Sequence, residues 1–242
     1  MGIHLLTKID TKQATTLLKR DYGFSSKIIA SRRARRVTLR VDTLTEDLRI
    51  TIPYKTPYNI LKRFVEKNRE WIRFQLSKSK PKIFVNIGSC LPIFGVSRLL
   101  LVDQNLNEDF LLYNDKLILS GQKACVNTQV KMLLKSLAKE YFENECKYYA
   151  EKLGVSYNKI VVKDTKSRWG SCSANGNMMF SWRLVLAPKL VSSYVSAHEV
   201  AHLVCLDHSS KFWKIVGRIC PEYPQHRAWL RKNGMDLHRF VF

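Results

Sequence analysis

Residues 198–208 read HEVAHLVCLDH, and this stretch decides how the rest of the chain is interpreted. Apolar side chains surround its two leading histidines, and residues 188–206 together predict a largely buried helix. In a helix, His198 and His202 lie one turn apart on one face, so both imidazoles can reach one ion. Glu199 projects from the adjacent position, where it can contact water at that ion without itself being a ligand.

A third histidine follows this pair. His208 comes six residues after His202, a spacing that lets the chain leave the helix and return an imidazole to the same ion. Three neutral nitrogen ligands and one open position are typical of a catalytic zinc site, although imidazoles also accept cobalt, nickel or copper. We therefore predict Zn²⁺ bound by His198, His202 and His208, with Glu199 as the catalytic acid–base residue. A later carboxylate is the competing third ligand, but the downstream acids lack a helical ExxxD spacing.

Outward from this stretch, hydrophobic periodicity predicts both strands and helices. Predicted strands lie at 37–41 and 48–52 (a hairpin with a polar link), within 82–120 (a small antiparallel sheet), and at 159–163 and 179–186. Further predicted helices cover 57–78, 126–153, 210–218 and 224–233. Residues 1–30 are only weakly patterned.

The composition excludes several classes of protein. The chain has 242 residues, 45% hydrophobic and 25% charged, which is globular usage for one large domain or two small ones. The stretch richest in apolar residues is far too short to span a membrane, and the first residues lack a secretory signal. The six cysteines are scattered and form no CxxC pair, so we expect free thiols and a cytoplasmic location.

The charge is strongly positive and unevenly distributed. The formal net charge is +21, and residues 1–80 carry 19 basic and 7 acidic side chains. The densest run is SRRARR at residues 31–36. Such a region can hold a nucleotide or nucleic acid by neutralising phosphates, or it can be simply a solvated basic surface. Both interpretations stay open from the sequence.

The segment KSRWGSC, residues 166–172, lies between two predicted strands upstream of the histidine helix. Arg168 is a candidate substrate-binding residue, because a guanidinium can hold an anionic group or stabilise a developing oxyanion. The other interpretation of this segment is structural: Trp169 packs, Gly170 permits a bend and Cys172 is a small buried thiol.

The chain resembles the YgjP-like zinc metallopeptidases, a zincin-like family related to SprT-like proteases. The resemblance rests on the segment KSRWGSC, on Trp182-Arg183-Leu184 with Ala187-Pro188, on HEVAH, and on Asp207-His208-Ser209 with Phe212-Trp213. The basic hairpin at 32–52 and Glu70-Trp71-Ile72 also look like the amino-terminal part of the family. Asp207 stands where the family usually has Asn, which can alter the surroundings of the third histidine without removing a ligand.

The resemblance implies a zincin-type fold, with the metal ligands at His198, His202 and His208 and the acid–base residue at Glu199. We therefore predict an α+β protein: a β-rich module with the basic hairpin and one helix over 1–120, and a zincin-like metallohydrolase domain over 121–242. The expected activity is zinc-dependent hydrolysis of peptide bonds. Two alternatives remain: a metal-dependent nucleotide pyrophosphatase, and a protease associated with nucleic acid through the amino-terminal region. No membrane partner is expected.

Overall fold

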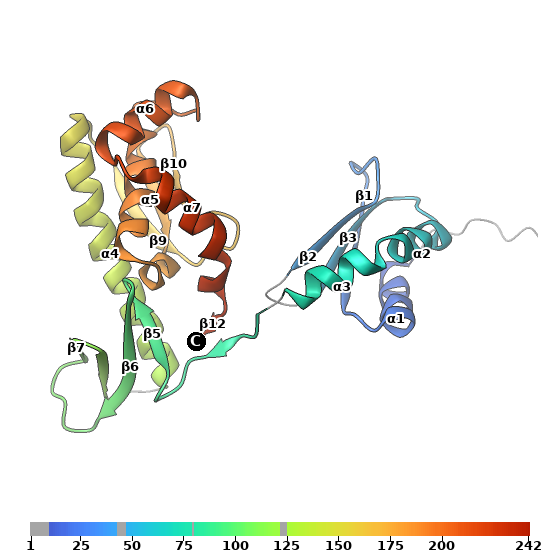
Figure 1. Cartoon of the computed structure of the whole chain (residues 1–242), viewed down its shortest axis with the longest axis horizontal. Coiled ribbons are helices and arrows are strands. Elements are labelled where there is room, and N and C mark those ends of the chain that lie inside the picture. Colours follow the sequence, from blue (N-terminus) through green and yellow to red (C-terminus); the bar gives the residue numbers. More distant parts are fainter. Residues whose placement is uncertain (1–9, 43–46, 79, 122–124) are drawn as a thin grey trace, which may run out of the picture. The chain divides into compact units, whose positions relative to one another are not determined.

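The computed structural model describes residues 10–42, 47–78, 80–121 and 125–242. The chain forms two compact units, residues 1–82 and residues 83–242, each with its own hydrophobic core. Both units mix helices with small sheets, so the α+β class predicted from the sequence is confirmed (Figure 1). Among the described residues, no helix combines the length and hydropathy needed to cross a bilayer.

The unit of residues 1–82 packs three helices against one face of a three-stranded sheet. Its elements are α1 (Thr11–Tyr22), β1 (Ser26–Ser31), β2 (Thr38–Asp42), β3 (Asp47–Pro53), α2 (Tyr58–Lys67) and α3 (Arg69–Ser77). Strand β3 is central, antiparallel to β2 and parallel to β1. The predicted hairpin is therefore present, although its link at 43–46 lies outside the described residues. The core joins Leu18 of α1, Leu61 of α2 and Ile72 of α3 to strand residues such as Ile50.

Two features of this unit differ from the sequence prediction. The weakly patterned residues 11–31 form α1 and β1. The single helix expected over 57–78 is broken at Asn68, whose side-chain amide donates a hydrogen bond of 2.7 Å to the Phe64 carbonyl. An Asn side chain that takes the acceptor normally used by a backbone N–H favours such a break.

The unit of residues 83–242 has one core shared by three small sheets and several helices. Its strands are β4 (Ile83–Phe84), β5 (Cys90–Ile93), β6 (Val96–Asp103), β7 (Phe110–Tyr113), β8 (Lys116–Ser120), β9 (Lys159–Lys163), β10 (Gly170–Cys172), β11 (Asn177–Ser181) and β12 (Phe240–Val241). Its helices are α4 (Val126–Leu153), the 3-10 helix η1 (Trp182–Leu186), α5 (Lys189–Ala201), α6 (Ser210–Ile219), α7 (Tyr223–Asn233) and the 3-10 helix η2 (Gly234–His238).

The long helix α4 organises this unit. It lies alongside α5 and the sheet of β9–β11, and it ends at Gly154, as the sequence predicts (Figure 1). Phe142 of α4 stacks on Phe180 of β11 with ring centroids 4.3 Å apart. In the sheet order β10-β11-β9, β10 pairs antiparallel with β11 and forms an edge. This edge strand runs next to α5, which carries the paired histidines.

The sheet of β5–β8 belongs to this second unit. Its order is β5-β6-β8-β7, with β6 and β8 parallel, so the entirely antiparallel sheet expected from the sequence is replaced by a mixed one. Leu91, Leu100 and Leu117 are fully buried in the same core as α4 and α5. The boundary between the compact units therefore falls at residue 82, whereas the sequence analysis placed it at residue 120. Local periodicity does not reveal which core a short apolar strand joins.

Candidate metal centre

Helix α5 supplies the first two predicted ligands. His198 lies in its last turn, and His202 is the residue that ends it. Most residues of the helix are buried, and these are mainly apolar or small. The ring centroids of His198 and His202 are 4.9 Å apart. The helix is shorter than the predicted 188–206, because the chain turns at residues 202–204 instead of continuing. This turn directs the following segment back toward the histidines.

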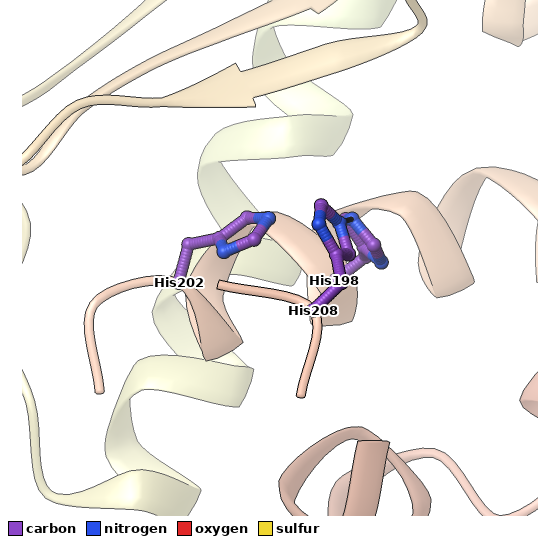
Figure 2. Close-up of side chains that lie close together, drawn as sticks. All are labelled: His198, His202 and His208. Atoms are coloured by element: carbon purple, nitrogen blue, oxygen red, sulfur yellow. Dashed lines mark hydrogen bonds between the residues drawn. The ribbon is translucent and has the colours of Figure 1, made fainter. Parts of the chain in front are cut away.

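His208 comes from that returning segment. Its Nε2 lies 3.1 Å from Nε2 of His198, and the ring of His202 points toward both (Figure 2). The ligand atoms of the three histidines all lie within 4.8 Å of one another. Asp207 shapes the turn: its carboxylate accepts a hydrogen bond of 2.9 Å from the Ser209 backbone N–H. The structure thus brings together all three predicted ligands.

The surroundings of His198 and His202 favour neutral imidazoles. Burial, with the neighbouring His202 and His208, lowers the pKa of His198 to about 3. Burial likewise lowers the pKa of His202. Nδ1 of His202 lies 3.0 Å from the Cys205 carbonyl, which fits an Nδ1–H donor and leaves Nε2 with a free lone pair. A neutral imidazole with one nitrogen held by a carbonyl is the usual form of a metal-ligating histidine.

Glu199 is buried beside these rings. The residue is only 4% exposed, and its Oε2 has no hydrogen-bond partner among the residues that the structure describes. Burial raises its pKa to about 8, against the opposing charge of Arg168. A buried carboxyl oxygen without a partner is costly unless a missing group satisfies it. Nδ1 of His198 is also buried without a partner.

These observations test whether a metal ion suits the residues present. Three imidazole nitrogens within reach of one point form a donor set that Zn²⁺ accepts in tetrahedral sites with one open position. Glu199 is adjacent to His198 in the sequence, and its buried unpartnered oxygen can accept a hydrogen bond from water. The residues therefore fit such an ion.

Gly170 on the edge strand β10 allows Glu199 to occupy its position. A Cβ built on Gly170 would lie 2.7 Å from Cγ of Glu199 and would also collide with the carboxyl group. From the sequence, Gly170 is expected only to permit a bend. The tight contact comes from two segments distant in sequence, and no local pattern signals it.

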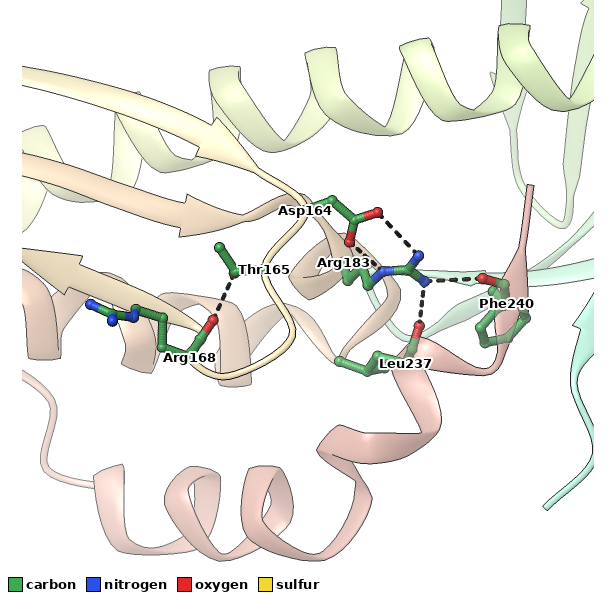
Figure 3. Close-up of polar contacts among 6 residues, drawn as sticks. All are labelled: Asp164, Thr165, Arg168, Arg183, Leu237 and Phe240. Carbon is green, nitrogen blue, oxygen red and sulfur yellow. Dashed lines mark hydrogen bonds and ion pairs between the residues drawn. The ribbon is translucent and has the colours of Figure 1, made fainter. Parts of the chain in front are cut away.

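Arg168, the predicted substrate-binding residue, is exposed just before β10. Its carbonyl accepts a hydrogen bond of 2.8 Å from Thr165 Oγ1, and its guanidinium points away from the ion pair of Asp164 and Arg183 (Figure 3). The neighbouring Trp169 packs against Gly234 and His238, with ring centroids of Trp169 and His238 5.0 Å apart. Arg168 is thus free to contact a ligand, whereas Trp169 has a packing role.

Arg183 has a structural function that sequence reasoning missed. Its guanidinium contacts Asp164 at 2.7 and 3.2 Å and donates to the carbonyls of Leu237 and Phe240 at 3.1 and 3.0 Å (Figure 3). It therefore joins the end of β9 to the last residues of the unit. Arg183 is part of the motif Trp182-Arg183-Leu184 that contributes to the family resemblance. No local pattern, however, indicates its distant partners Asp164, Leu237 and Phe240.

A cleft opens beside His202. Its volume is about 790 Å³, and it is lined by the segments 154–158, 174–176 and 202–204 together with Leu206. Phe212 is fully buried, and Trp213 lies with its ring centroid 5.7 Å from that of His198. The histidine cluster therefore borders a cleft at His202 and also packs against aromatic rings.

The chain is similar to one known family and to one solved structure described below. A family model described as YgjP-like, metallopeptidase domain, matches residues 35–233. No curated protein matches the chain. Among solved structures, the chain is similar to the metallopeptidase zymogen abylysin of Pyrococcus abyssi, with 22% identity and a TM-score of 0.34. That match covers 37% of this chain and 93% of that chain. Since the family model spans most of the sequence, the chain belongs to the YgjP-like family and carries its metallopeptidase domain.

Proposed function

We propose that the chain is a zinc-dependent peptidase whose metal ligands are His198, His202 and His208 and whose acid–base residue is Glu199. The observation that carries the proposal is the convergence of three imidazoles beside a buried carboxyl group with an unpartnered oxygen. When bound there, Zn²⁺ would polarise water and a substrate carbonyl. The chain belongs to a family of metallopeptidases, and this membership supports peptide bonds as the substrate class.

Glu199 would perform the proton transfers. Its buried carboxylate would accept a proton from the attacking water and then give that proton to the leaving amine. A raised pKa suits both steps, because the group must be a base first and an acid afterwards. The fixed tautomer of His202 would keep one lone pair directed toward the metal position.

The edge strand β10 would hold the substrate. It pairs with β11 on one side only, so its other side is available for an extended peptide. Arg168, exposed immediately before β10, would contact an acidic group of that peptide. We propose it as a substrate-binding residue.

The test compares wild type, Glu199→Gln, His202→Ala and a control, Glu140→Gln, in which an exposed carboxylate of α4 is removed. Metal content and cleavage of an unfolded protein are measured on the same samples. Glu199→Gln should keep one zinc ion per chain and lose turnover, His202→Ala should lose both, and the control should resemble wild type.

Three results would contradict the proposal. A fully active Glu199→Gln protein would remove Glu199 from the reaction, and absence of zinc after metal-replete preparation would remove the metal site. Glu199-dependent release of phosphate or pyrophosphate from nucleoside triphosphates, without peptide cleavage, would favour the phosphohydrolase alternative instead.

A further inference from the structure

None of the described helices of the amino-terminal unit, α1, α2 and α3, covers one of the two faces of its sheet. Its other face forms the core with α1, α2 and α3, and β-strand side chains alternate between the two faces. Strand register places Lys27 of β1 opposite Arg49 of β3, and Arg49 opposite Arg40 of β2. All three side chains are exposed. They form a row of cations across the sheet, which we call the cationic row.

This row is electrostatically unfavourable in the isolated protein. Neighbouring strands lie about 4.8 Å apart, so each cation faces a like charge directly across the ladder, an arrangement that destabilises a sheet. Within the described part of the chain, none of the three makes an ion pair with a carboxylate. Asp47, which lies on the same face of β3, is not within ion-pair distance of them. Among the described residues, these three cations therefore have no ion-paired carboxylate that an external anion would have to displace.

More cations border the same face. The segment 32–37 joins the end of β1 to the start of β2, and Arg33, Arg35 and Arg36 are exposed on it. On the same face, Thr38 of β2 and Thr51 of β3 form the residue pair between the cationic row and this segment. Their hydroxyl groups can donate hydrogen bonds to phosphate oxygens. The face thus combines fixed cations with small polar donors.

We propose that this face binds the phosphate backbone of duplex nucleic acid without reading its sequence. The row spans about 10 Å, over which a duplex presents several phosphates. The sheet residues of the face include no aromatic ring on which bases of a single strand could stack. Its most apolar exposed side chain is Ile29, which is 37% exposed, and this is too little apolar surface to favour insertion into a lipid interface.

The experiment measures binding of the full-length chain to a labelled 20-base-pair DNA duplex by fluorescence anisotropy, over a series of salt concentrations. The test variant carries Lys27→Gln, Arg40→Gln and Arg49→Gln. Its affinity at 50 mM salt should fall by at least about tenfold, and the slope of log affinity against log salt should decrease by about two to three. Its thermal unfolding should not shift downward, because the substitutions relieve repulsion.

A matched control removes three exposed cations from the helices of the same unit: Arg63→Gln, Lys67→Gln and Arg73→Gln. This variant has the same net charge as the test variant and should bind the duplex within about threefold of wild type. Glu199→Gln should bind the duplex like wild type, since the proposal does not depend on the metal centre.

Several outcomes would overturn the proposal. The proposal would be wrong if the wild-type protein did not bind the duplex at 50 mM salt. It would also be wrong if the test and control variants lost affinity equally. Tighter binding to a single strand of the same length would contradict the duplex assignment. Row-dependent binding to phosphatidylserine vesicles in preference to DNA would identify a membrane surface as the partner instead.

Discussion

At the scale of the residue, Gly170 shows how closely the edge strand approaches the buried carboxyl group. A methyl group at this position would have to displace Glu199, because the added carbon would lie only 2.7 Å from Cγ of that residue. Gly170→Ala should therefore lower turnover by about 10²-fold, as expected for a misplaced acid–base group, while zinc content stays near one per chain. Steady-state kinetics and metal analysis on the same sample check this.

Gly217 in the interior of α6 provides the matched control. A Cβ there would lie 3.5 Å from the nearest atom, on Tyr223, which is an ordinary contact. Gly217→Ala should keep full activity and raise the free energy of unfolding by about 0.5–1 kcal/mol, since alanine is the better helix former. Equal activity in the two alanine variants would show that the approach of Gly170 to Glu199 has no functional consequence.

The three histidines were predictable from the sequence, whereas their surroundings were not. Spacing in a helix places His198 and His202 on one face, and a six-residue offset suffices for His208 to return. The carbonyl that holds His202 belongs to Cys205 in the turn that ends α5, where a continuous helix was expected from the sequence. The glycine that accommodates Glu199 comes from tertiary packing, which joins two segments whose local patterns are independent of each other.

At the scale of the element, the ion pair of Asp164 and Arg183 fixes the end of β9 to η1. Burial opposes ionisation of Asp164, but the hydrogen bond and charge of Arg183 outweigh it, so the pKa of Asp164 is lowered. A lowered pKa in the folded state contributes stability that is present above the unfolded pKa and is lost as pH falls through the folded value. This contribution should therefore decline progressively as the pH falls below about 4.

Asp164→Asn tests this dependence. Wild type should lose more free energy of unfolding than Asp164→Asn between about pH 5 and pH 3, as measured by urea denaturation at each pH. Glu108→Gln, which removes an exposed carboxylate without an ion pair among the described residues, is the control and should follow wild type. Parallel curves for Asp164→Asn and wild type would contradict the role of the ion pair.

Element boundaries follow local chemistry in some places and tertiary contacts in others. The end of α4 at Gly154 is local, since glycine adopts the positive φ of 65° found there. The segment 179–186 was expected to be one strand, yet β11 ends at Ser181 and η1 follows. Residues 182 and 184–186 are buried in either conformation, so their apolar character cannot distinguish a strand from a tight helical turn.

At the scale of the whole molecule, the two cores predict how the chain can be divided. The core around the metal centre contains residues from 83 onward, including Leu91, Leu100 and Leu117. A fragment of residues 83–242 should therefore unfold cooperatively and bind one zinc ion per chain. A fragment of residues 121–242 lacks those leucines and leaves the face of the core that they cover in contact with water, so it should aggregate or remain unfolded.

Circular dichroism melting and metal analysis of both fragments check this prediction. A folded, zinc-binding fragment of residues 121–242 would show that the sheet of β5–β8 is dispensable for the core. Failure of both fragments would show that residues 1–82 are needed for the second unit to fold, despite its separate core.

The pairing of β12 with β4 has a consequence for engineering this molecule. Phe240 lies opposite Ile83 and Val241 opposite Phe84 in a parallel ladder, so the second unit begins and finishes in neighbouring strands of one small sheet. Because the ladder is parallel, a peptide bridge from residue 242 to residue 83 has to cross to the neighbouring strand and run back along its length. Each of these strands has only two residues, so the bridge can be short. The polypeptide of this unit can accordingly be made circular, or reopened at an exposed loop such as 104–109, with the histidine site left intact.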